Sequence, residues 1–164
     1  MTDDERDPAA YAADIDAARD RMIGFVSGCG DEEWRAAPLD GDPRPVAVVV
    51  DHVAHAYEYL AGWISQLVAG QPVEVDSDVV DALNAQHARD AKAVSRDEAT
   101  EHLRRSGSAI SVLVAGLDPA GPAGLAAGDG RVRLMAQIAA RHADEHRADI
   151  EAALAARGSS AGTQ

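Results

Sequence analysis

The sequence predicts an all-α protein: a single four-helix bundle with one short extra helix between the second and third long helices. The 164-residue chain is long enough to bury a core, and 46% of it is apolar but only 4% aromatic, which favours Ala, Val and Leu packed between helices. Apolar residues recur at helical spacing in four long segments, and proline and glycine gather between these segments. Four amphipathic helices of this length typically pack as a bundle.

Each predicted helix is bounded by residues that favour its start or its end. The long helices are expected at about 8–26, 46–69, 95–117 and 131–157, and the short one at about 77–94. Pro8 suits a first helical turn, and Gly158 is expected to stop the last helix. Ser95 and Glu98 match a capping box, in which each side chain covers the other residue's free backbone N–H.

The remaining segments are predicted to be loops and tails. Loops are expected at 31–45 and 118–130, which are rich in proline and glycine. We expect one domain at 8–157, with disordered polar tails at 1–7 and 158–164.

Composition and charge exclude several classes of partner. The formal net charge is -13, from 28 acidic and 15 basic residues, and no basic cluster is interleaved with aromatics. Nucleic-acid binding is not expected, because phosphate contacts need a basic face. No stretch is long and apolar enough to span a membrane, and the first residues lack the pattern of a signal peptide. Cys29 is the only cysteine, so no intramolecular disulfide can form and a cytoplasmic location is expected.

His142 and His146 are four residues apart on the last predicted helix. Both imidazoles therefore project from one face, at a separation that one divalent metal can bridge. They belong to a row at four-residue spacing that is expected to face the bundle interior: Leu134, Ile138, His142, His146, Ile150 and Leu154. Buried histidines must satisfy their polar nitrogens, so the pair needs either separate hydrogen-bond partners or a shared metal. The spacing alone leaves both interpretations open.

The second long helix offers a third ligand. At about 100° per residue, His52 falls at the edge of its apolar stripe, whereas His55 falls on the opposite side and is expected to be a solvated surface residue. Tyr59 and Trp63 lie on the flank of His52, where they are either pocket walls or ordinary interhelical packing residues.

A few other polar residues are secondary candidates. Asn84 and His87 on the short helix could face the same pocket, and His102 lies at the edge of the apolar stripe of the third long helix, although most such residues are structural. Three acidic residues adjoin ligand candidates in sequence but point elsewhere on their helices, so solvated charges are expected: Asp51, Glu58 and Glu145.

Two segments resemble signatures of the DinB-like four-helix-bundle superfamily, which includes the mycothiol-dependent maleylpyruvate isomerases and the bacillithiol S-transferases. Residues 44–55, RPVAVVVDHVAH, resemble the signature of its second helix, and residues 141–150, RHADEHRADI, resemble that of its fourth. The resemblance extends over about residues 8–157. It implies a divalent metal bound by His52, His142 and His146, the same three residues that the helical faces select, and it implies a homodimer. It fixes no catalytic base.

This ligand set suggests a chemistry. Three neutral imidazoles leave the full charge on a divalent ion, together with open coordination positions, so that a bound water or thiol becomes more acidic. We therefore expect a metal-dependent enzyme that activates a low-molecular-weight thiol, or water, for transfer to or hydrolysis of a small electrophile. Zinc is the first expectation, with nickel or iron as alternatives.

Lys92 is the only lysine among the 15 basic residues, a bias that resembles an actinobacterial genome and makes mycothiol the expected thiol by analogy. The alternative is a non-enzymatic, stress-related bundle that binds a metal or a small ligand.

Overall fold

The structure is a computed structural model that describes residues 6–91 and 94–161. The described residues form six helices and no strand, which confirms the all-α class. The helices are α1 (Pro8–Gly28), α2 (Asp31–Arg35), α3 (Val46–Val68), α4 (Ser77–Asp90), α5 (Arg96–Ala115) and α6 (Arg131–Ala161).

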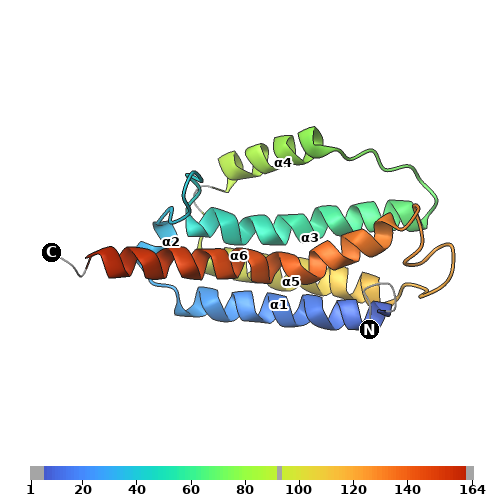
Figure 1. Ribbon diagram of the computed structural model, residues 1–164, viewed down its shortest axis with the longest axis horizontal. Helices are drawn as coiled ribbons and strands as arrows, with labels where there is room; N and C mark the ends of the chain where they lie inside the picture. Colours follow the sequence, from blue (N-terminus) through green and yellow to red (C-terminus); the bar gives the residue numbers. More distant parts are fainter. Residues whose placement is uncertain (1–5, 92–93, 162–164) are drawn as a thin grey trace.

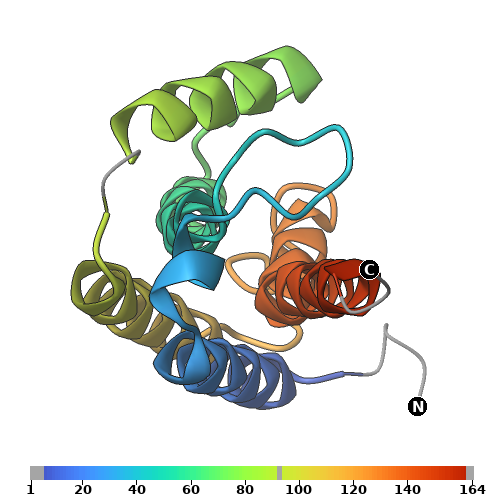
Figure 2. The same ribbon diagram turned by 90° about the vertical axis from the view of Figure 1, so that its left-hand side faces the viewer.

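The four long helices form the predicted bundle (Figure 1). Helices α1 and α3 each pack against both α5 and α6, so α1 and α3 lie on one diagonal of a square. The end view in Figure 2 shows this square, with α4 outside it beside α3. The core between the helices consists mainly of Ala, Val, Ile and Leu, as the composition predicts.

Helix α4 determines the topology of the bundle. It runs back along α3 and returns the chain to the end where α3 began, so α3 and α5 run in the same direction (Figure 1). Long crossover connections of this kind occur in natural four-helix bundles. As a result, the first turns of α3 and α5 lie at the same end of the bundle as the last turns of α4. The histidines of these three helices lie toward that end: His52 and His55 on α3, His87 on α4 and His102 on α5.

The first half of α3 is buried on all sides. Every residue from Val46 to Ala54 is buried, including Asp51 and His52. The run that begins this helix is apolar in every direction, and such a helix is stable only when neighbours cover all of its faces. Helices α5 and α6 cover two sides of α3, and α2 and α4 also contact it.

The predicted loop at 31–45 was wrong in its first residues, which form the short helix α2. Three acidic residues in its first turn favour a helix start, because carboxylates interact well with the N-terminal end of the helix dipole. Trp34 is buried, and its indole N–H donates to the carbonyl of Val94 at 3.1 Å. Tertiary contact thus fixes a helix that is too short to be recognised by periodicity.

Other boundaries differ at the helix ends. Helix α6 continues through Gly158 to Ala161, so the predicted tail was wrong for 158–161, because one glycine costs a helix only about 1 kcal/mol. The residues predicted as tails at 1–5 and 162–164 lie outside the described part. The short helix ends at Asp90, and 92–93 also lie outside that part. Leu134, expected to face inward, is 53% exposed in the first turn of α6.

Among the helices formed by residues 6–91 and 94–161, none has both the length and the apolar character needed to cross a membrane.

Candidate metal centre

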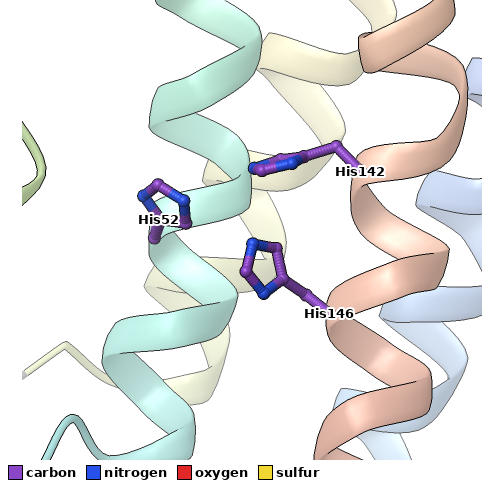
Figure 3. A group of neighbouring side chains, drawn as sticks. All are labelled: His52, His142 and His146. Atoms are coloured by element: carbon purple, nitrogen blue, oxygen red, sulfur yellow. The ribbon is translucent and has the colours of Figure 1, made fainter. Parts of the chain in front are cut away.

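Three histidines converge between α3 and α6 (Figure 3). His52 comes from α3, and His142 and His146 come from successive turns of α6. One ring nitrogen from each lies within 4.8 Å of the other two. The ring centroids are 4.6 Å apart for the α6 pair, and the ring of His52 is 5.3 Å from each of them. The structure thus brings together the three residues that the sequence predicts as ligands.

Burial favours the neutral form of these imidazoles. Loss of hydration, with repulsion from the other two histidines, lowers the pKa of His52 to about 3. Burial and repulsion from His146 lower the pKa of His142 to about 4. Burial and then the positive charge of Arg44 lower the pKa of His146. Neutral imidazole is the form that binds a metal, so near pH 7 no proton has to leave these rings.

One nitrogen at this site has no hydrogen bond. His142 Nε2 is buried and finds no partner among the residues that the structure describes. Leaving such a group unsatisfied costs about 1–3 kcal/mol, and a metal ion would supply the missing partner. The donor set also suits the expected ions, since imidazole binds zinc, nickel and iron. The residues present therefore fit a divalent transition metal.

Arg44 places a positive charge near the three-histidine site. It acts on both His52 and His146, lowering the pKa of each. Its Nη2 donates to Asp42 Oδ2 at 2.7 Å, and its Nε lies 3.0 Å from both carboxylate oxygens of Asp42. The segment just before α3 thus adds an ion pair beside the histidines.

The other three histidines form a second cluster around α3. Its members come from three helices: Asp51, His55 and Glu58 from α3, His87 from α4, and His102 from α5. His87 Nε2 donates to Asp51 Oδ2 at 2.9 Å, and His102 Nδ1 donates to Asp51 Oδ1 at 2.8 Å. His102 Nε2 also lies 3.1 Å from Glu58 Oε1. All six histidines of the chain therefore belong to one of two neighbouring groups.

The predictions for Asp51 and His55 as solvated residues were wrong. Asp51 is 6% exposed, and the side chain of His55 is 34% exposed with its Nδ1 3.8 Å from Asp51 Oδ2. Both lie on the face of α3 that was expected to meet solvent and that α4 and α5 cover instead. Two signals in the sequence pointed to this result: the apolar run at the start of α3 and the four-residue spacing of Asp51 and His55.

Charge within the second cluster is stabilised by hydrogen bonds. Burial alone would raise the pKa of Asp51, but the hydrogen bonds from His102 and His87 hold it well below its usual range. The hydrogen bond to Asp51 raises the pKa of His102, against the opposing effect of burial. Asp51 is therefore a carboxylate whose two oxygens face different histidines.

A cleft of about 840 Å³ opens between α3, α4 and α5. The predicted pocket residues divide around it: Tyr59 and His87 line it, whereas Trp63 and Asn84 do not. Trp63 stacks on Tyr59 at 5.9 Å and packs against the core. The ring of His87 is 5.9 Å from that of His52, so this residue lies between the cleft and the three-histidine site.

The fold and the site define an all-helical bundle with a candidate three-histidine metal centre between two of its long helices. The profile of the DinB superfamily matches residues 14–150, most of the chain, and the protein belongs to this superfamily. The resemblance inferred from residues 44–55 and 141–150 is thereby confirmed. No curated protein and no solved structure matches the chain significantly.

Proposed function

We propose that this protein is a divalent-metal-dependent enzyme that activates a low-molecular-weight thiol, or water, for transfer to or hydrolysis of a small electrophile. One observation carries the proposal: three histidines held neutral by burial converge, and His142 Nε2 among them is buried without a hydrogen-bond partner in the described structure. A divalent metal bound there lowers the pKa of a water or thiol that it coordinates, which supplies a nucleophile near neutral pH. Zinc is the metal we propose, with nickel or iron as alternatives.

The side chains of this protein would contribute in three ways. His52 on α3 and the histidine pair on α6 would hold the ion between two packed helices, which limits their movement. Their neutral rings would leave the charge of the ion uncompensated. Arg44 adds a positive potential that favours an anionic nucleophile or substrate, moderated by its ion pair with Asp42.

Composition and family support our choice of reactants. We propose mycothiol as the thiol, a small-molecule electrophile as its partner, and a homodimer in the cytoplasm as the working form. The acidic surface implied by a net charge of -13 makes nucleic acid an unsuitable partner.

Metal analysis of His142→Ala tests the proposal. The protein would be purified without chelators and its metal content measured by mass spectrometry, with Glu145→Gln as a matched control. Glu145 is on the same helix and its side chain is 63% exposed, so that variant changes a nearby charge but no ligand. We expect His142→Ala to lose one metal equivalent and Glu145→Gln to lose none. Equal metal content in the wild type and His142→Ala would contradict the metal site.

Activity distinguishes an enzyme from a metal-binding bundle. Conjugation of mycothiol to a chromogenic aryl halide, and hydrolysis of a chromogenic ester, would be measured before and after chelation. We expect one of these activities to disappear on chelation and in His142→Ala, and to persist in Glu145→Gln. Bound metal without either activity would favour the non-enzymatic alternative.

A further inference from the structure

We propose that Asp51, His55 and His87 form a second site for a divalent transition-metal ion, in the cleft between α3, α4 and α5. One ligand atom from each lies within 4.8 Å of the other two. Two imidazoles and a carboxylate are a donor set that binds zinc and iron(II) in proteins. This site goes beyond the proposed function, which uses only the three-histidine site.

The distances are close to those of a formed site. Asp51 Oδ2 lies 2.9 Å from His87 Nε2 and 3.8 Å from His55 Nδ1, and the two histidine rings are 4.5 Å apart. Two ligands bound at 2.0–2.1 Å around a tetrahedral ion are about 3.4 Å apart. The two measured distances lie on either side of this value, so side-chain shifts of about half an ångström would bring the atoms to it.

Unpartnered nitrogens distinguish this cluster from a complete hydrogen-bond network. His55 Nδ1 and His87 Nδ1 are both buried, and neither atom forms a hydrogen bond with any residue that the structure describes. The side chain of His87 is only 3% exposed, so water has little access to it. A network that served packing alone would be expected to satisfy its buried nitrogens, because each unsatisfied one costs about 1–3 kcal/mol. An ion beside Asp51 would give His55 Nδ1 a partner, and it would bind His87 at Nε2 in the tautomer that carries its proton on Nδ1.

The surrounding residues orient the carboxylate toward this position. His102 donates to Asp51 Oδ1 at 2.8 Å, which leaves Oδ2 directed at the two candidate histidine ligands. His102 is itself held by Glu58 at 3.1 Å. Hydrogen bonds that fix the ligands of a metal from behind are a usual feature of metal sites. His102 is therefore a positioning residue for Asp51.

The rim of the cleft favours a cation. Four carboxylates from α4 and α5 line it, and Arg105 is the one arginine or lysine in its described lining. These four are Asp90, Asp97, Glu98 and Glu101. Like charges gathered at a cleft raise the local concentration of the opposite ion. The occupant that fits both the rim and the interior is a metal cation.

Metal stoichiometry of the full-length protein tests the second site. Metal-free protein would be equilibrated by dialysis against Zn²⁺ and counted by mass spectrometry, and Co²⁺ absorption would report the ligands. Three variants would be compared with the wild type: His55→Ala in the second site, His142→Ala in the first, and Glu145→Gln as a control that removes a charge outside both sites. Glu145 lies on α6 outside the lining of the cleft, its side chain is 63% exposed, and it pairs with Arg141.

We expect two ions per chain in the wild type and in Glu145→Gln, and one in each histidine variant. Zinc content that is the same in the wild type and His55→Ala would overturn the second site, whether or not His142→Ala loses an ion. One ion in the wild type that is lost in His55→Ala but kept in His142→Ala would support the second site and contradict the proposed function. Circular dichroism would check that each variant folds, and His87→Gln would replace His55→Ala if that variant does not.

Discussion

Acid should destabilise the metal-free protein through the three-histidine site. In the folded chain the pKa of His52 is about 3 and that of His142 about 4, whereas unfolded histidine has a pKa of about 6.5. Between these values the unfolded chain binds more protons than the folded one, so stability must fall as pH falls. The stability associated with these neutral rings is complete above about pH 6.5 and is lost progressively below it.

The size of this effect follows from linkage. From pH 8 to pH 5, each of the two histidines lowers the free energy of unfolding by about 2 kcal/mol. Because His142 contributes to the pKa shift of His52, the two effects are not independent, and we expect a combined loss of between about 2 and 4 kcal/mol. The lowered pKa values of His55 and His146 act in the same direction. The raised pKa of His102 acts in the opposite direction, because its stabilisation is complete below pH 6.5 and is lost as pH rises.

Urea unfolding of the chelator-treated protein at several pH values measures this loss. His142→Gln should flatten the dependence between pH 8 and pH 5, since it removes one of the titrating groups. His102→Gln should steepen it, since it removes the group of opposite sign. Stability that is constant or greater at pH 5 in the wild type would refute the reasoning.

Three further predictions concern the bundle and the second cluster. Ser95→Ala should lower the free energy of unfolding by about 1 kcal/mol, because the Ser95 hydroxyl caps α5 by accepting from the backbone N–H of Glu98 at 3.2 Å. Urea unfolding measures this loss, and an unchanged unfolding midpoint would contradict the capping role. Leu103→Ala should cost about 2–5 kcal/mol in the same assay, because Leu103 is fully buried in the core, and a loss below 1 kcal/mol would show that the core is not packed as described. His102→Gln should weaken Zn²⁺ binding at the second site by about 10–100-fold in a calorimetric titration while the first site keeps its affinity; equal weakening of both sites would indicate a general structural effect.

Most of the helical framework could be predicted because local signals mark it. The capping box at Ser95 and Glu98 is present as predicted, with the serine N–H donating to the glutamate at 2.9 Å. Proline at position 8 begins α1, and the glycine and proline after α3 follow its end. Short α2 was not predictable, since five residues carry no helical period and depend on the buried contact of Trp34.

The candidate site was predictable only where one helix face was enough to define it. The i, i+4 pair on α6 and the position of His52, judged from helical angles alone, selected the three histidines that the structure brings together. The second cluster depends on where α4 and α5 pack against α3. The apolar run at the start of α3 and the four-residue spacing within it indicate that this face is covered, but they do not identify the residues that cover it. Consequently Asp51 and His55 were expected to be solvated, and the long-range contacts with His87 and His102 became visible only in the structure.

The complete burial of the first half of α3 links the two candidate sites mechanically. Asp51 and His52 are adjacent residues on one rigid helix, and each belongs to a different group of ligands. A rotation or a shift of this helix that tightens one group must therefore move the other as well. If both sites hold ions, an ion at the first site changes the affinity of the second site by some factor. An ion at the second site must then change the affinity of the first site by the same factor. Helix α3 is therefore a single structural element through which metal binding at one site would affect metal binding at the other.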